Sequence, residues 1–230
     1  MKHTGYCLML DTKEYGEIFS LQKKLNQARF ERKIPDTVIF LEHHPCYTIG
    51  RKGGEDHILV SDTCLEKEGI TIYETDRGGD ITYHGPGQLV CYPILDLHDY
   101  GSDVHVYARK LEETMILTLK KFGIMGARKE GFPGIWVDGK KIGFMGVAIN
   151  HWVTMHGISL NVSPNMNYFA QIIPCGLANV TVSSMADILP NPVTVNEVAR
   201  EMRHHCATVF NIELQDIDLK LIEEMMGDVG

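Results

Sequence analysis

A glycine-rich polar stretch, Arg77 to Gln88, constrains this chain more than any other part of its sequence. Four glycines and one proline fall within its first eleven residues, which disfavours a regular helix. Glycine also lets the backbone come close to a ligand. The residues that follow, Leu89 to Ile94, are apolar and partly β-branched, the pattern of a buried strand. A polar loop held by a buried strand is a common way to build a ligand site, and we expect one here.

The composition fits one globular domain and disfavours nucleic acid as a partner. At 230 residues the chain is long enough for a single sizeable core, and we expect residues 1–230 to form one domain. Thirty acidic residues against 22 basic ones give a net charge of −8, which disfavours nucleic acid as the main partner. An acidic protein partner would need a local basic patch. No apolar segment approaches membrane-spanning length, so we expect no membrane association.

The six cysteines are widely scattered, and none belongs to a Cys-x-x-Cys pair. Because no long apolar signal region follows Met1, we expect a cytoplasmic protein whose thiols stay reduced. Most of these cysteines should behave as small buried hydrophobes. Cys91, which lies inside the apolar strand, is the clearest example.

Cys175 is the one cysteine in a setting that suits reactivity. Pro174 ends the segment before it and Gly176 frees the backbone after it, so a turn offers its side chain. A thiol with the ordinary pKa of about 8.5 is mostly protonated at neutral pH, so a nucleophilic cysteine needs a nearby cation or base. The candidates for this partner are Lys141, His84 and His156.

Hydrophobic periodicity predicts a protein of the α+β (α/β) class, with a mixed, largely antiparallel sheet flanked by helices. We expect amphipathic helices over 14–32, 104–122 and 195–210, the last with Thr194 as its N-cap, and one or two helical turns after Gln215. A turn is expected at 131–134, and Asp138-Gly139 predicts a hairpin. Strands are expected over 6–10, 37–42, 70–73, 89–95, 135–137, 141–149 and 152–161.

Two adjacent histidines, His43 and His44, with Cys46 nearby, raise the question of a metal site. Neighbouring residues of an extended strand point to opposite faces, so the two imidazoles cannot easily share one ion. Zinc needs four ligands at a structural site or three at a catalytic one. We therefore expect no metal and no other cofactor, and expect these histidines to hydrogen-bond their neighbours.

The stretch Arg-Gly-Gly-x-x-Thr-Tyr-His-Gly-Pro-Gly-Gln resembles the signature of the lipoyl(octanoyl) transferases. Other segments of this family match as well. They are Glu-His-x-Pro-x-x-Thr-x-Gly from Glu42, Lys-Ile-x-x-x-Gly-Val from Lys141, His-Gly-x-x-Leu-Asn from His156, and Pro-Cys-Gly around Cys175. His57 fits the family's loop after the first of these. The resemblance covers about residues 37 to 185.

The resemblance implies the catalytic fold of the biotin and lipoate-protein ligases. It also implies that Cys175 is the acyl-accepting nucleophile and Lys141 the catalytic lysine. Phe144, Met145 and Ile158 could line a tunnel for an eight-carbon chain. The substrate-binding residues that we expect on this basis are Arg77, Gly78, Gly79, Asp80, Ile81, Thr82, Tyr83, His84, Phe144, Met145, Gly146, Gly157, Ile158 and Ser159.

Two points depart from the family pattern. Gly143-Phe144 stands where small, alanine-like residues are usual, so the pocket wall beside Lys141 can differ. Lys140-Lys141 is a doublet, and a slip of one residue along a strand would point the amine to the other face. The residue that precedes Ile142 matches the motif, which favours Lys141.

The implied reaction is a two-step transfer without ATP or metal. Cys175 takes an octanoyl group from octanoyl-acyl carrier protein as a thioester. The group then passes to a lysine on a lipoyl domain of a 2-oxoacid dehydrogenase complex or on the glycine cleavage H protein. Lys141 can stabilise the thiolate as a cation, or accept a proton from the incoming lysine as a neutral amine.

Two other classes of protein remain as alternatives. An ATP-dependent lipoate or biotin-protein ligase would share the fold, but would need an adenylate-binding loop and no cysteine. The Arg-Gly-Gly-x-x-Thr-Tyr-His form and the Pro-Cys-Gly motif argue against it. A non-catalytic acyl-binding module is the other alternative, which the joint presence of Lys141 and Cys175 argues against.

Overall fold

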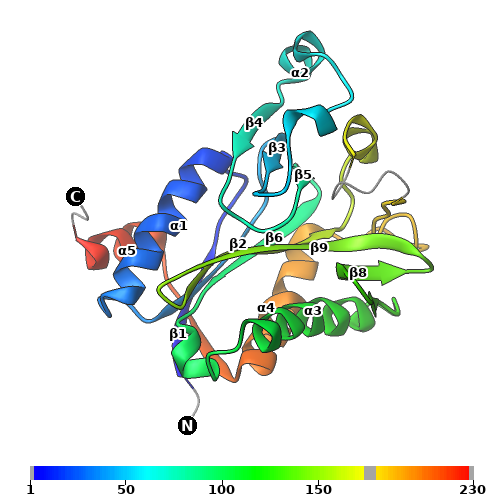
Figure 1. Ribbon diagram of the computed structural model, residues 1–230. Helices are drawn as coiled ribbons and strands as arrows, with labels where there is room; N and C mark the ends of the chain where they lie inside the picture. The colour runs from blue at the N-terminus through cyan, green and yellow to red at the C-terminus, as the bar shows by residue number, and fades with distance from the viewer. Residues whose placement is uncertain (1–2, 174–179, 228–230) are drawn as a thin grey trace.

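The computed structural model describes residues 3–173 and 180–227, and its largest feature is an eight-stranded sheet (Figure 1). The strand order is β11-β1-β2-β6-β10-β9-β8-β7. β1 pairs in parallel with β2 and β11, and all other neighbours in this sheet are antiparallel. The predicted mixed, largely antiparallel sheet is confirmed. The strands are β1 (His3–Met9), β2 (Asp36–Leu41), β6 (Gln88–Ile94), β7 (Ala127–Lys129), β8 (Phe132–Val137), β9 (Lys140–Asn150), β10 (Val153–Asn161) and β11 (Ile212–Asp216).

Helices cover both faces of this sheet, so its central strands are apolar on both sides. α3 and α4 pack against one face, and α1 and α5 against the other (Figure 1). Alternate residues of β2 follow this division, because Val38 and Phe40 join the core under α3 and α4 while Ile39 and Leu41 join the core under α1 and α5. The four helices are α1 (Tyr15–Phe30), α3 (Val104–Lys121), α4 (Val195–Phe210) and α5 (Leu219–Met226).

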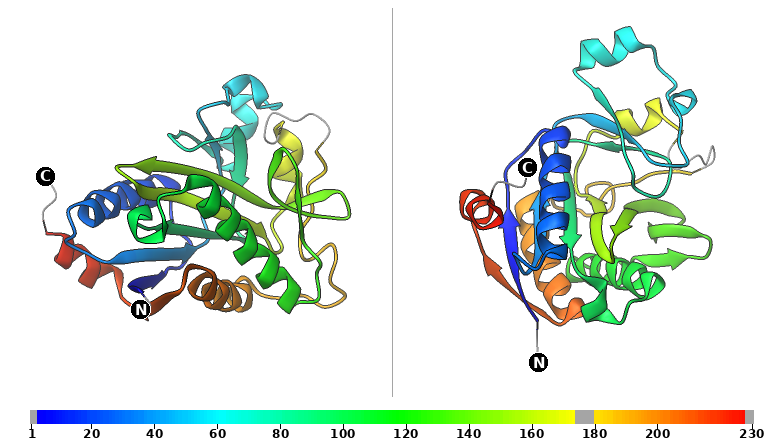
Figure 2. Two further views of the ribbon diagram at one scale, coloured as in Figure 1. Left: turned by 60° about the horizontal axis from the view of Figure 1, so that its bottom comes forward. Right: turned by 60° about the vertical axis from the view of Figure 1, so that its left-hand side comes forward.

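A second sheet of three strands, in the order β4-β3-β5, rises beside the main one together with α2 (Figure 2). Its apolar residues form a third core cluster, which Phe144 of β9 joins from the main sheet. This contact ties the two sheets together. The elements are β3 (Cys46–Ile49), β4 (Thr71–Glu74), β5 (Ile81–His84) and α2 (Asp62–Glu68), with short 3₁₀ helices η1 (Glu55–His57), η2 (Leu97–Tyr100) and η3 (Met166–Gln171).

The structure confirms the three long predicted helices, the hairpin at Asp138-Gly139 and most predicted strands. Three expectations were wrong. The stretch that begins at Arg77 is not loop throughout, because Ile81–His84 forms β5. The turn expected at 131–134 ends at Gly131, and β8 begins at Phe132. β3, β7, β11 and α2 were not foreseen, and Gln215 belongs to β11 while the last helix begins at Leu219.

In the part of the chain that the structure describes, no helix is both long enough and apolar enough to cross a membrane. The cysteines of these residues are all free, and four of them are buried, as expected for small hydrophobes. These four are Cys7, Cys46, Cys91 and Cys206.

The N-terminus of α4 provides a test of local stability. The Thr194 hydroxyl accepts a hydrogen bond from the backbone N–H of Glu197, whose carboxylate accepts one from the N–H of Thr194. We expect Thr194→Ala to lower the free energy of unfolding by about 1 kcal/mol, measured by urea denaturation. Ser61→Ala is the control, because Ser61 precedes α2 without a capping hydrogen bond from its side chain. An equal loss in both variants would contradict this account.

Candidate active site

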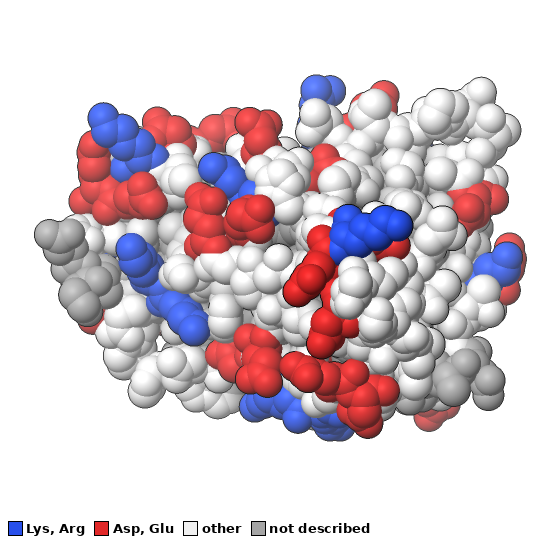
Figure 3. Space-filling view, turned by 90° about the horizontal axis from the view of Figure 1, so that it is seen from above, with Lys and Arg blue, Asp and Glu red and all other residues white. Residues whose placement is uncertain are grey.

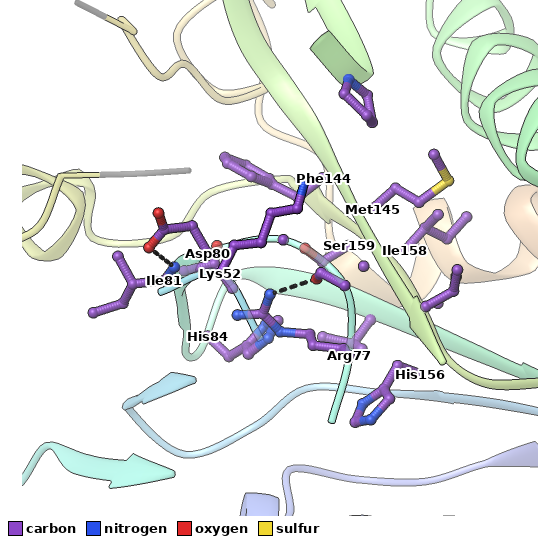
Figure 4. A pocket seen from close by; sticks show the side chains of 18 of the residues that line it. Lys52, Arg77, Asp80, Ile81, His84, Phe144, Met145, His156, Ile158 and Ser159 are labelled. Atoms are coloured by element: carbon purple, nitrogen blue, oxygen red, sulfur yellow. Dashed lines mark hydrogen bonds between the residues drawn. The ribbon is translucent and has the colours of Figure 1, made fainter. Parts of the chain in front are cut away.

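A cavity of about 430 Å³ lies between the small sheet and strands β9 and β10, beneath the loop that runs from Arg77 to Asp80 (Figure 4). Its lining is mostly apolar, with polar groups at its two ends. The lining includes every substrate-binding residue expected from the sequence except Tyr83. The further lining residues are Tyr15, Lys52, Val90, Tyr92, Gly131, Phe132, Pro133, Lys141, Val147 and His156.

The buried guanidinium of Arg77 fixes the loop that roofs the cavity. Its Nη2 donates to the carbonyl oxygen of Thr48 at 2.5 Å and to the hydroxyl at 2.9 Å, and its Nη1 donates to the carbonyl oxygen of Gly78 at 3.1 Å. The backbone N–H of Gly78 donates to the carbonyl oxygen of Val147 on β9. The loop is therefore bound to the small sheet on one side and to the main sheet on the other.

Glycines allow this close approach at two positions. Gly79 has φ of 87°, a left-handed conformation that glycine adopts without steric cost. A Cβ on Gly146 would lie 3.0 Å from both Cδ of Arg77 and the carbonyl oxygen of Gly78. The polar loop can thus lie directly on the sheet because neither position carries a side chain.

Lys141 lies at the opposite end of β9 from that contact. It is 4% exposed and lines the cavity, whereas Lys140 is exposed to solvent on the other face of the strand. Its Nζ lies 5.1 Å from the ring centroid of Phe144 and 5.7 Å from that of Trp136, within the range of cation–π attraction. The register of the strand therefore brings Lys141, and not Lys140, to the cavity.

Cys175, with Pro174 and Gly176, lies outside the described residues. The described residues on either side of this segment are held near the cavity. The N–H of Ile173 donates to the carbonyl oxygen of His57, and the N–H of Lys141 donates to the carbonyl oxygen of Thr181 at 2.8 Å. Ser183 then donates back to the carbonyl oxygen of Lys141, which extends the contact.

Asp80 connects the glycine loop to the segment before Cys175. Its Oδ1 accepts hydrogen bonds from the N–H of Ile81 at 2.6 Å and from Nδ1 of His57 at 2.7 Å. The hydrogen bond to Asp80 raises the pKa of His57 above its ordinary value. His57 therefore holds Asp80 with its side chain and Ile173 with its backbone.

Three buried histidines surround Tyr15, and two of them, His84 and His156, line the cavity. Burial lowers the pKa of His43 to about 4 and lowers the pKa of His84 well below its ordinary value. Nε2 of His156 is 2.7 Å from Oδ1 of Asp76, and Nδ1 of His84 is 2.6 Å from Oε1 of Gln88. His156 pairs with Val147, six residues beyond Lys141 on β9, which is about 20 Å along the strand. His156 is therefore far from Lys141, although both were expected as candidate partners of Cys175. Cys175 lies outside the described residues, so the choice among these candidates stays a prediction.

Tyr83 is the expected site residue that the structure places elsewhere. Thr82 and His84 line the cavity, so the alternation of side chains along β5 turns Tyr83 the other way. Its ring packs against Tyr47 and Phe169, with centroids 5.9 Å and 5.4 Å away. Tyr83 thus supports the small sheet from behind the cavity.

The histidines near the first motif do not form a chelate. His43 is buried, with Nδ1 3.0 Å from the carbonyl oxygen of Lys13 and Nε2 2.9 Å from the hydroxyl of Tyr92, while His44 is exposed. Among residues 3–173 and 180–227, no group of three His, Cys, Asp or Glu side chains is placed to hold a metal ion.

Sequence reasoning missed several lining residues. Tyr15, at the start of α1, and Tyr92, inside β6, read as ordinary core residues, because nothing local shows which face they occupy. Lys52 follows the first family motif, and its exposed position at the mouth of the cavity depends on the pairing of loops distant in sequence. The antiparallel pairing of β6, β10 and β9 brings Tyr92 to the same cavity as Lys141 and His156.

The His57–Asp80 pair gives a measurable titration. We expect NMR to find the pKa of His57 above 6.5 in the native protein, and lower in Asp80→Asn. A raised folded pKa means that the pair adds stability below the unfolded pKa of about 6.5, and that this is lost as the pH rises through the folded pKa. Asp56→Asn is the control, since Asp56 has the weaker effect on His57. A His57 pKa that is equal in both variants would refute the assignment.

Comparison with known proteins identifies the family. The model of the lipoyl protein ligase A/B catalytic domain matches residues 14–207. The chain is 41% identical to an octanoyltransferase of Gloeobacter violaceus, over 92% of this chain and 93% of that one. It is 39% identical to an octanoyltransferase of Syntrophobacter fumaroxidans, over 99% of this chain and all of that one. A bipartite lipoate protein ligase from Thermoplasma acidophilum has the same fold, with a TM-score of 0.75 at 16% identity, covering 97% of this chain and 89% of that one. The chain therefore belongs to the lipoyl protein ligase A/B catalytic-domain family, and within it to the lipoyl(octanoyl) transferases, which are acyltransferases.

Proposed function

We propose that this protein transfers an octanoyl group from octanoyl-acyl carrier protein to a lysine of lipoyl domains, through a thioester on Cys175. The observation that carries the proposal is the burial of Lys141 at one end of a largely apolar cavity, beside the anchored residues that precede and follow Cys175. The similarity to octanoyltransferases supports octanoyl as the group that is transferred. The acceptors are the lipoyl domains of 2-oxoacid dehydrogenase complexes and the glycine cleavage H protein. One catalytic domain over residues 1–230 does this work in the cytoplasm.

The apolar part of the cavity suits the acyl chain. Phe144, Met145 and Ile158 line it, and the chain gains about 0.8 kcal/mol for each CH₂ that it buries. Arg77 and the glycines after it place backbone groups along the chain's path. The thioester end then lies toward Lys141. The full set of lining residues expected from the family, apart from Tyr83, is proposed to contact substrate on this basis.

The two half-reactions of this transfer need neither ATP nor a metal, because every bond that forms replaces one that breaks. The thiolate of Cys175 attacks the thioester carbonyl of the donor, a new C–S bond forms, and the carrier thiolate leaves and takes up a proton. The neutral amine of the acceptor lysine then attacks the acyl-enzyme. A C–N bond forms, the amine loses a proton, and the Cys175 thiolate is released. A thioester is exchanged for a thioester in the first step, and the amide made in the second is more stable.

Lys141 serves both half-reactions in this scheme. As a cation it stabilises the Cys175 thiolate, and as a neutral amine it accepts the proton of the incoming lysine. The rings of Phe144 and Trp136 shield it from water. Its backbone hydrogen bonds to Thr181 and Ser183 fix it relative to the chain that follows Cys175.

Docking of an acidic carrier must rely on local charge. On the face shown in Figure 3, acidic and basic side chains are interspersed, and Lys and Arg do not gather into one continuous area. The whole chain carries a net charge of −8. Lys52 is exposed at the mouth of the cavity and supplies positive charge where the carrier's prosthetic group would enter.

An ATP-dependent ligase is the second candidate function, favoured only by the fold shared with lipoate protein ligases. The two reactions differ in what they require. The transferase should form product from octanoyl-acyl carrier protein without ATP. Product that forms only with ATP and free octanoate would favour the ligase.

The covalent intermediate gives the first test of the transferase. Incubation with octanoyl-acyl carrier protein should add one octanoyl group to the intact mass of the native protein and none to Cys175→Ser. Cys91→Ala is the matched control, because Cys91 is buried in β6 and should affect stability without affecting the adduct. Full turnover by Cys175→Ser would refute the mechanism.

The lysine doublet gives a second test. Lys141→Ala should reduce turnover by at least about 10²-fold, because it removes both the cation and the proton acceptor. Lys140→Ala should retain most activity, because this side chain is exposed on the other face of β9. Lys141→Arg keeps the cation but cannot accept a proton, so it should impair amide formation more than acylation in single-turnover assays. The reverse ranking of the two alanine variants would refute the role of Lys141.

A further inference from the structure

The cavity has a far end that the proposed chemistry does not use. Val147 lies six residues beyond Lys141, about 20 Å along β9, and pairs with His156 of β10. Figure 4 shows His156 at the opposite end of the cavity from Lys52 and Phe144. An acyl chain attached beside Lys141 can extend along β9 toward His156.

The backbone of His156 is held in an unusual conformation. Its φ of 57° is left-handed, which is uncommon for a residue other than glycine and rare inside a strand. The register of β6 with β10, which pairs Ile158 with Cys91, places Pro93 opposite His156, and proline has no N–H for the ladder. The N–H of His156 donates instead to Oε1 of Gln22 at 2.7 Å. Neighbouring groups thus support a conformation that histidine alone would not favour.

This conformation turns the imidazole toward α1. Met155 already packs in the core beneath α1, and regular alternation would direct His156 to the other face. The His156 ring instead lies 5.2 Å from that of Phe19, and its Nδ1 lies 3.3 Å from the hydroxyl of Tyr15. The left-handed backbone of His156 therefore places its imidazole beside Tyr15 at the end of the cavity.

Both nitrogens of this ring are engaged. Burial lowers the pKa of His156, so the neutral form is present at neutral pH. Nε2–H then donates to Oδ1 of Asp76 at 2.7 Å, which leaves Nδ1 to accept from the hydroxyl of Tyr15. The ring is fixed from two sides. It forms a stiff end to the cavity, and its polar groups are satisfied without a ligand.

We propose that Tyr15 and His156, which line the cavity and which we call the end wall, limit the acyl chain that the enzyme accepts to about eight carbons, with Asp76 holding the His156 ring from outside the cavity. This rests on the proposed function. Nζ of Lys141 lies beside Phe144, and Val147 is three residues further along β9, or about 10 Å. An extended octanoyl chain, with zigzag C–C bonds of about 1.5 Å, is about 9 Å long. Because the Lys141 side chain extends as far as Phe144, only about 10 Å of the roughly 20 Å between the backbones of Lys141 and Val147 is left for the acyl chain. A chain of ten or more carbons would then meet the imidazole of His156.

The test compares acyl carrier protein thioesters of six, eight, ten and twelve carbons as donors, with an apo-lipoyl domain as acceptor and mass spectrometry as readout. The native enzyme should prefer eight carbons and fall off at ten. His156→Gly removes the ring and accepts the left-handed backbone, so it should raise the ten-to-eight rate ratio by about tenfold, since each added methylene can then be buried. His156→Asn, which tolerates the same backbone, should give a smaller shift in the same direction.

His151→Gly is the matched control. His151 is also left-handed, with φ of 50°, but is exposed in the turn between β9 and β10, away from the cavity. It should leave the chain-length profile unchanged. The proposal would be wrong if the ten-to-eight rate ratio stayed unchanged in both His156 variants, or if it rose equally in His151→Gly. A uniform loss at every length would also refute it, because it would reveal a merely structural role. Failure of the native enzyme to transfer octanoyl at all would overturn the proposed function itself.

Discussion

The site depends on the buried guanidinium of Arg77. It binds Thr48 of the small sheet and the carbonyl of Gly78, whose N–H is bound to Val147 of the main sheet. Charged hydrogen bonds of this kind are strong when they are shielded from water, and a buried guanidinium without them would be costly. Because the loop between the sheets is also the roof of the cavity, the same hydrogen bonds that join the two sheets define the space for a substrate.

The antiparallel pairing of β9 and β10 then separates two ends of that space. Lys141 is held at one end by the backbone of Thr181 and Ser183, which follow Cys175 in sequence, and His156 at the other by α1. The spacing between them follows from the rise per residue of a strand, so it cannot change without a shift of register. Apolar side chains lie between the two ends, and the polar groups beyond them are bonded to one another. This order suits a molecule with a polar head and an apolar tail.

The sequence predicted most helices and the hairpin at Asp138-Gly139, because apolar periodicity and turn residues are local signals. The choice of Lys141 over Lys140 rested on the family motif alone, and the register of β9 is what brings Lys141 to the cavity. The misplacement of Tyr83 followed from treating Ile81–His84 as loop, since recognition of β5 would have turned Tyr83 away from Thr82 and His84 by alternation. The left-handed backbone of His156 had no local signal. The residues around it, Pro93 opposite and Gln22 as the acceptor of its N–H, are far away in sequence and become its neighbours only in the folded chain.

A fold shared with lipoate protein ligases does not decide the chemistry, which depends on the residues of the site. A ligase must activate a carboxylate, whereas a transferase receives an acyl group that is already a thioester. The mechanism proposed above therefore needs a nucleophile, a group that accepts and returns a proton, and exclusion of the water that would hydrolyse a thioester intermediate. The rings of Trp136 and Phe144 serve the last of these needs, because they lie within 6 Å of Nζ of Lys141 and this side chain is buried. Phe144 stands where small residues are usual in this family. Its ring lies beside Nζ of Lys141 and helps to exclude water from this end of the cavity.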